Sequence, residues 1–160
     1  MNLDVLKRQF ENDPRCFQIA DKLTMSAPVH IHLKGLEGSS PEFIVAALRQ
    51  MDMLSQTNHM VVVRDAEEAA YFQNTLENIT GALDIFYFPS SFKNRKNYKL
   101  LNSSHVMLRT EALTRIATGG NRKIIITYPE ALMEKVVLPK KLSENIISIK
   151  QSDTLDVDGM

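Results

Sequence analysis

The chain has 160 residues, of which 44% are hydrophobic and 24% charged, a composition typical of one soluble globular domain with a buried core. Nineteen basic and nineteen acidic residues give a formal net charge of zero, so no overall charge attracts the chain to nucleic acid or to an anionic membrane. The single cysteine, Cys16, excludes an intrachain disulfide and a cysteine-ligated zinc site. The charged N-terminus is unlike a signal peptide, and no apolar run approaches the roughly 18 residues of a membrane span. We therefore expect a cytoplasmic protein that binds no membrane.

Residues 1–25 are expected to form a small helical lead-in that packs on the main domain. Their apolar residues recur at helical spacing, and the sequence Asn12-Asp13-Pro14 divides them into two short helices. The apolar positions are Leu3, Leu6, Phe10, Phe17, Ala20 and Leu23.

From residue 29 the pattern predicts strands that alternate with helices. The run "VHIHL" at 29–33 predicts a strand, a Gly/Ser turn follows, and "PEFIVAALRQMDML" predicts a helix with Pro41 at its first position. A second strand is expected at 59–63. The next helix is expected to have Asp65 as its N-cap and Gly81 at its end. Its apolar stripe consists of Ala69, Phe72, Leu76 and Ile79.

Two more strands are predicted at 84–88 and 123–127, and a short helix from Pro129. The helix between these strands has a set of apolar positions, Leu108, Ala112, Leu113 and Ile116, and ends at Gly119 and Gly120. Apolar strands that alternate with helices predict an α/β fold, with a parallel sheet buried on both faces, flanked by helices and linked by right-handed crossovers. Because the pattern changes near residue 139, we divide the chain into the lead-in, an α/β domain at 26–139 and the start of a next small domain at 140–160.

The loop at 35–42 has the position of a phosphate-binding loop but lacks its chemistry. The working pattern is G-x-x-x-x-G-K-[ST], in which backbone amides and the lysine hold the phosphates and the hydroxyl binds Mg²⁺. Aligned on Gly35, the chain has Ser40, Pro41 and Glu42 in place of the second glycine, the lysine and the hydroxyl residue. Pro41 has neither an ammonium group nor a backbone donor, and Glu42 and Glu37 bring negative charge. The vestigial loop consists of Gly35, Gly38, Ser39, Ser40, Pro41 and Glu42, and we expect it to bind no cofactor.

Two alternatives remain for this loop. It is a plain strand-to-helix turn if its glycines only supply conformational freedom and Ser39 or Ser40 caps the helix. The second alternative is that the protein is an enzyme, with a small nucleotide-binding α/β domain that uses the Gly35–Ser40 loop. The charges of Glu37 and Glu42 and the lack of a full G-x-G-x-x-G pattern argue against the enzyme.

Four stretches follow one another along residues 26–139: "LKGLEGSSPEFIVAAL", "HMVVVRDAEEAAYFQNTL", "IFYFPSSFKNRKNY" and "LRTEALTRIATGGNRKIIITYPEALMEKVVLP". In their order and spacing they resemble the N-terminal module of bacterial transcription-repair coupling factors (Mfd), which is itself similar to the first domain of the excision-repair protein UvrB. Several positions of the last stretch fall on the family's pattern, namely Arg109, Leu113, Gly119, Thr127 and Leu132. The resemblance implies a P-loop or helicase-like fold, UvrB domain 1-like, with a degenerate nucleotide site.

The resemblance also implies a function. Such a module is non-catalytic and helps recruit UvrA, the damage-recognition protein, to RNA polymerase stalled at DNA damage. It contacts other domains of the parent protein, an ATP-dependent DNA translocase whose motor motifs are absent here, and reaches RNA polymerase and DNA through that parent. In the family the UvrA-docking surface lies mainly in the second small domain, of which this chain contains only a predicted strand at 146–150. We therefore expect the chain itself to be no enzyme.

The remaining polar motifs are weaker. The loop "SFKNRKNYK" at 91–99 interleaves basic and aromatic residues and suits weak nucleic-acid contact through Lys93, Arg95, Lys96 and Tyr98, with a solvated loop as the alternative. No metal site is expected, because no Asp, Glu or Cys at ligand spacing joins the histidines, His30, His32, His59 and His105. We expect Cys16 to be a half-buried structural thiol, and Met51 and Met53 to pack in the core.

Overall fold

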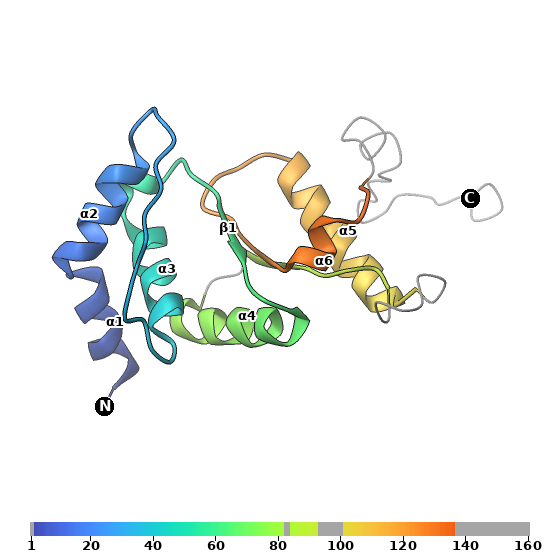
Figure 1. Cartoon of the computed structure of the whole chain (residues 1–160), viewed down its shortest axis with the longest axis horizontal. Coiled ribbons are helices and arrows are strands. Elements are labelled where there is room, and N and C mark those ends of the chain that lie inside the picture. The colour runs from blue at the N-terminus through green and yellow to red at the C-terminus, as the bar shows by residue number, and fades with distance from the viewer. Residues whose placement is uncertain (1, 82–83, 93–100, 137–160) are drawn as a thin grey trace, which may run out of the picture.

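The computed structural model describes residues 2–81, 84–92 and 101–136. At its centre, three strands form a parallel sheet in the order β1-β3-β2, with β1 at His59–Val62, β2 at Ile85–Phe88 and β3 at Ile124–Thr127. Helices α4 (Ala66–Thr80) and α5 (Ser103–Ala117) lie on opposite sides of this sheet (Figure 1). The predicted α/β fold, a parallel sheet flanked by helices, is confirmed. The segment 140–160, with its predicted strand at 146–150, lies outside the described residues.

The central strand is β3, and all four of its residues are buried. His59 and Ile85 flank Ile124 in the register, so each outer strand pairs with β3 along its full length. Strand β1 lies at the edge, and its Met60 and Val62 are 57% and 50% exposed. The expectation of burial on both faces is therefore right for β3 and wrong for β1, because no helix of the described chain covers the face that carries Met60 and Val62.

Helix α4 forms where its sequence predicts it. The Asp65 side chain accepts a hydrogen bond from the Glu68 backbone N–H at 2.9 Å, which satisfies one of the free amides at the helix start. At the other end Gly81 takes a left-handed φ of 63°, and its N–H donates to the Glu77 carbonyl. The predicted apolar stripe is buried in the core in full: Ala69, Phe72, Leu76 and Ile79.

Helix α5 differs more from its prediction. Asn102 caps its start, so the helix begins at Ser103, well before the first predicted apolar position. Ala112 is buried as expected, but Leu108 and Ile116 are 38% and 45% exposed, while Arg109 is only 5% exposed. The predicted apolar stripe is wrong at Leu108 and Ile116. Helix α5 packs mainly on the edge strand β2, so only a narrow side of the helix is buried.

Helices α1 (Leu3–Glu11) and α2 (Pro14–Leu23) form the expected lead-in, and both contact α3 (Ser40–Gln50). A second apolar cluster holds α2 against α3 and the short 3-10 helix η1 (Asp52–Leu54). Its buried members are Cys16, Ile19, Ala20, Ala47, Leu48, Met51 and Leu54. The helical period is right, but the apolar side was only partly predicted, since Leu3, Phe17 and Leu23 are 44%, 45% and 42% exposed.

Residues 24–38 lie between α2 and α3 and contain no strand, so the predicted strand at 29–33 is wrong. Ile31 packs against the α2–α3 cluster, whereas His30 and His32 are exposed. The alternating pattern therefore reflects packing of one side of an irregular stretch on helices. The following helix also ends earlier than predicted, because Met51 takes an extended conformation with φ −69° and ψ 127°. Met51 is buried as expected, but Met53 is 50% exposed, which corrects its assignment to the core.

Candidate functional site

The loop between Gly35 and Glu42 satisfies its own polar groups. Gly35 and Gly38 take positive φ values of 74° and 54°, which residues with a Cβ atom rarely adopt. The Ser40 hydroxyl accepts a hydrogen bond from the Glu37 N–H at 3.1 Å and also contacts the Glu37 carbonyl. The Ser40 N–H donates to the same carbonyl at 3.1 Å. Two of the amides that a phosphate loop would offer are therefore already in use.

The first turn of α3 offers little more to an anion. Ser39 occupies the N-cap position, as expected, but its side chain accepts no hydrogen bond from the helix backbone. Pro41 lies in the first turn and has no N–H to donate. The Phe43 N–H donates to the Ser39 carbonyl at 3.2 Å. A phosphate cradle needs several free amides that converge on one point, and these residues do not provide it.

Glu42 makes the site electrostatically unfavourable for a phosphate. The residue is only 5% exposed. Burial raises the pKa of its carboxyl group, its own backbone amide opposes that shift, and the Glu68 carboxylate adds to it. The N-terminus of a helix stabilises a nearby negative charge, and in α3 the carboxyl group of Glu42 already occupies that position. A nucleotide would place further negative charge beside a carboxyl group that is poorly solvated.

A cleft of about 580 Å³ adjoins this loop, between the start of α3, the end of β1 and the start of α4. Its residues are Gly38, Pro41, Glu42, Val45, Val61, Val62, Val63, Arg64, Glu68, Tyr71 and Phe72. The guanidinium of Arg64 turns to its neighbour Asp65, with Nε 3.0 Å from a carboxylate oxygen, and its side chain is 81% exposed. The cleft thus combines apolar walls with the carboxyl groups of Glu42 and Glu68.

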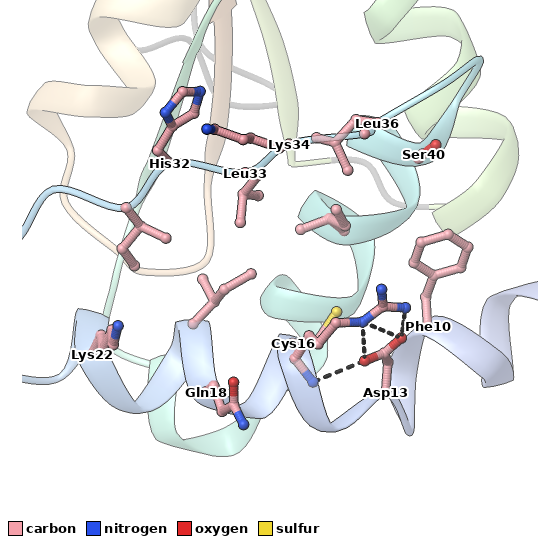
Figure 2. Close-up of a pocket in the computed structure, with 15 residues that line it drawn as sticks. Phe10, Asp13, Cys16, Gln18, Lys22, His32, Leu33, Lys34, Leu36 and Ser40 are labelled. Atoms are coloured by element: carbon pink, nitrogen blue, oxygen red, sulfur yellow. Dashed lines mark hydrogen bonds and ion pairs between the residues drawn. The ribbon is translucent and has the colours of Figure 1, made fainter.

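A second cavity, of about 440 Å³, lies between α2 and residues 31–36 (Figure 2). Two of its lining residues, Lys22 and Lys34, are exposed. Asp13 is held by Arg15, with 2.6 Å between guanidinium nitrogen and carboxylate oxygen, and hydrogen bonds from Arg15 lower the pKa of Asp13 to about 2. Cys16 is buried, and burial raises the pKa of its thiol, which lowers its reactivity. Cys16 is thus a structural thiol, more buried than predicted.

The predicted nucleic-acid contacts, Lys93, Arg95, Lys96 and Tyr98, lie outside the described residues, so that hypothesis stays a prediction. The flanks of their loop are described: Phe92 and Leu101 form an antiparallel bridge, and the Asn102 N–H donates to the Ser91 carbonyl at 2.8 Å. Both ends of the basic loop therefore lie together beside the end of β2.

The four histidines do not form a metal-binding cluster in the described part of the chain. Across the described ranges, no group of three or more His, Cys, Asp or Glu side chains could hold a metal ion. Burial, and then the charge of Arg49, lower the pKa of His59. The His105 Nδ1 lies 2.9 Å from the Ser90 carbonyl oxygen. His30 and His32 stand on the exposed side of their stretch.

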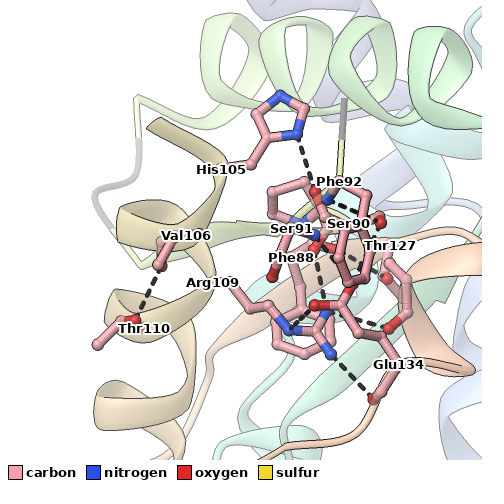
Figure 3. A network of polar contacts seen from close by, with 12 residues as sticks. Phe88, Ser90, Ser91, Phe92, His105, Val106, Arg109, Thr110, Thr127 and Glu134 are labelled. Atoms are coloured by element: carbon pink, nitrogen blue, oxygen red, sulfur yellow. Dashed lines mark hydrogen bonds and ion pairs between the residues drawn. The ribbon is translucent and has the colours of Figure 1, made fainter. Parts of the chain in front are cut away.

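The structure reveals one polar network that spacing in the sequence did not predict (Figure 3). The Arg109 guanidinium donates from Nη1 to the carbonyls of Pro89 at 2.9 Å and Ala131 at 3.0 Å, and from Nη2 to the Glu134 carbonyl at 3.1 Å. Its Nε lies 3.6 Å from a Glu134 carboxylate oxygen. The guanidinium carbon lies 4.0 Å from the centre of the Phe88 ring. One side chain thus joins α5, the end of β2 and the short helix α6 (Pro129–Leu132).

Glu134 completes this network. Its carboxylate accepts hydrogen bonds from the Ser90 hydroxyl at 3.1 Å and the Ser91 N–H at 2.9 Å. Burial alone would raise the pKa of Glu134, but bonds from Ser91 and Ser90 and the charge of Arg109 together lower it. Thr127 adds a hydrogen bond from its buried hydroxyl to the Phe88 carbonyl at 2.8 Å. Sequence spacing gave no signal for Glu134, because its partners lie far away in the chain.

The described part of the chain is a small α/β domain with a three-stranded parallel sheet and helices on both sides. No protein-family model, curated protein or solved structure matches it. Within the described ranges, none of the helices combines the length and apolar character that a membrane crossing requires.

Proposed function

We propose that this chain is a non-catalytic module of a transcription-repair coupling factor, where it helps recruit UvrA to RNA polymerase stalled at DNA damage. The parent protein in this proposal is an ATP-dependent DNA translocase, which the module regulates through contacts with the other domains. The observation that carries the proposal is Glu42, a buried carboxyl group in the first turn of α3, at the position that the resemblance aligns with the hydroxyl residue of a phosphate loop.

From α3 onward the order of the structural elements supports this proposal, whereas the strand expected before the loop is absent from the described residues. The stretches that resemble the family correspond to the loop with α3, to β1 with α4, to β2, and to α5 with β3 and α6. Two residues on the family's pattern also have defined structural roles. Arg109 joins three segments through its guanidinium group, and the Thr127 hydroxyl bonds across to β2.

The enzyme alternative, a small nucleotide-binding domain, has less support. Such a domain needs anion-binding groups between Gly35 and Ser40, and the amides of Glu37 and Ser40 are already engaged there. Weak DNA contact through the basic loop at 93–98 remains compatible with the repair proposal.

A calorimetric titration with Mg-ATP tests the non-catalytic part of the proposal. We expect no saturable heat for the chain at millimolar nucleotide. A matched variant restores the phosphate-loop chemistry through Ser40→Gly, Pro41→Lys and Glu42→Thr, and shows what the assay detects when the groups are present. Saturable binding of Mg-ATP by the unaltered chain would overturn the proposal and favour the enzyme alternative.

A binding assay with purified UvrA tests the recruitment part. We expect the proposed parent protein to bind immobilised UvrA and the 160-residue chain to bind weakly or not at all, because the family's docking surface lies mainly in the second small domain. If the two proteins bind UvrA equally, that division of labour is wrong. If neither binds UvrA, the recruitment role itself is refuted.

A further inference from the structure

The outer edge of β1 presents backbone groups that no described strand pairs with. The His59 N–H donates to the Lys123 carbonyl at 2.8 Å, and the Val63 N–H donates to the Thr127 carbonyl at 3.0 Å. Because alternate residues of a strand direct their amides to opposite sides, the amides of Met60 and Val62 point away from β3. Within the described ranges β1 has β3 as its one neighbour, so this edge is open to a further strand.

The cleft beside the phosphate-loop position continues this edge. Four consecutive residues, 61–64, line it. The first two belong to β1 and the last two follow its end, so the cleft adjoins the end of this edge. The other walls come from α3 and α4, and Tyr71 at the rim is 64% exposed. An extended segment that paired with β1 would have its side chains next to this cleft.

Glu42 gives the cleft a chemical preference. The residue is 5% exposed, and among the described residues its carboxyl group forms no ion pair; its own backbone amide is the one group that lowers its pKa. Arg64, the one cationic residue among the described residues that line the cleft, is paired with Asp65 instead. Glu68, the second carboxylate, raises the cost of the negative charge on Glu42. Burial and the charge of Glu68 both disfavour the charged form of Glu42, so a cation bound beside it would favour that form.

We propose that the edge of β1 and the adjoining cleft bind an extended peptide segment of a partner protein, with an arginine or lysine side chain that enters the cleft and pairs with Glu42. The peptide backbone would bond to Met60 and Val62, as in strand addition to other sheet edges. The stem of the basic side chain would lie on the valines of the cleft, and Tyr71 would contact its charged group. A phosphate would meet two carboxylates, and a purely apolar side chain would leave Glu42 unpaired. This inference does not depend on the repair proposal.

Fluorescence anisotropy with labelled octapeptides tests the inference. The peptides alternate threonine and valine and carry one arginine, placed at each position in turn, and a second set carries neutral citrulline instead. We expect arginine peptides to bind about tenfold to a hundredfold more tightly than citrulline peptides at one or two positions, as for a charge-assisted hydrogen bond. Amide hydrogen exchange at Met60 and Val62 should slow when the best peptide is bound.

Two variants make the test specific. Glu42→Gln keeps the size of the side chain and should reduce the preference for arginine to less than about twofold. Glu67→Gln is the matched control, because Glu67 is an exposed acid of the same helix as Glu68 and does not line the cleft, and it should leave the preference unchanged. Melting curves of both variants establish that each is folded.

Three results would overturn the inference. The first is the absence of binding by every peptide at millimolar concentration. The second is an arginine preference that persists in Glu42→Gln. The third comes from sedimentation of the unaltered chain: a dimer that Val62→Lys converts to monomer would show that a second copy of the chain occupies this edge.

Discussion

Arg109 is the side chain whose loss should weaken this fold most clearly. It is 5% exposed, donates three hydrogen bonds to carbonyls of Pro89, Ala131 and Glu134, and faces the Glu134 carboxylate. Arg109→Met keeps the length of the side chain but leaves those carbonyls and the carboxylate without a donor. Removal of one partner from a buried ion pair costs about 3–5 kcal/mol. For a chain of 160 residues this corresponds to a melting temperature lowered by about 6–20 °C.

Denaturant unfolding of four variants, each compared with the unaltered chain, measures this effect. The variants are Arg109→Met, Glu134→Gln and the two together, with Arg115→Met as an exposed control on the same helix that should change stability by less than about 0.5 kcal/mol. Because the neutral amide of Glu134→Gln needs no counter-charge, the double variant should lose about 0.5–3 kcal/mol less than the sum of the single losses. Exact additivity, or a loss below about 1 kcal/mol for Arg109→Met, would show that Arg109 and Glu134 do not stabilise the fold as one network.

Three further predictions concern pH and helix capping. The folded-state pKa of Glu42 is raised from its ordinary 4.5, so its contribution to stability is complete below pH 4.5 and is lost as pH rises through the folded value. Glu42→Gln should therefore melt at a higher temperature than the unaltered chain at pH 7 and lose that advantage at pH 4; an equal difference at both pH values would contradict this. The folded-state pKa of Glu134 is lowered from 4.5, so its contribution is present above pH 4.5 and is lost as pH falls through the folded value. Glu134→Gln should remove part of the acid-induced fall in melting temperature, measured by circular dichroism from pH 7 to pH 3, and an unchanged profile would count against it. Asp65→Ala removes the N-cap of α4 and should cost about 0.5–2 kcal/mol in denaturant unfolding, whereas a cost near zero would mean that Glu68 or water replaces the cap.

The elements that sequence predicted best are those in which local signals and tertiary packing agree. Helix α4 has a capping aspartate, a terminal glycine and a stripe that all specify the same ends and the same buried side. Strand β3 is apolar at consecutive positions and is buried on both faces, as that pattern predicts. In both cases the sequence signals that specify the element lie within about 17 consecutive residues, and no contact with a distant part of the chain has to be known.

The errors arose where distant contacts decide the outcome. The alternation at 29–33 fits a strand, but a strand also needs a neighbour, and Ile31 packs on helices instead. The exposed face of β1 has the same cause, since the apolar character of Met60 does not reveal that no helix of the described chain covers it. Within the candidate site, the missing lysine was evident from Pro41. The burial of Glu42 and its apolar surroundings required the positions of β1 and α4.

The strand order has a consequence for how the chain acquires its fold during synthesis. Strands β1 and β2 both pair with β3 and not with each other, so in the described part of the chain every sheet hydrogen bond waits for the strand that the ribosome makes last. The roughly 60 residues between β1 and β3 take about 3–12 s to synthesise at about 5–20 residues per second. During that interval the apolar strands have no partner among the described strands, and such unpaired strands are exposed to wrong association. A chain interrupted before residue 124 would therefore contain helices without the sheet that organises them.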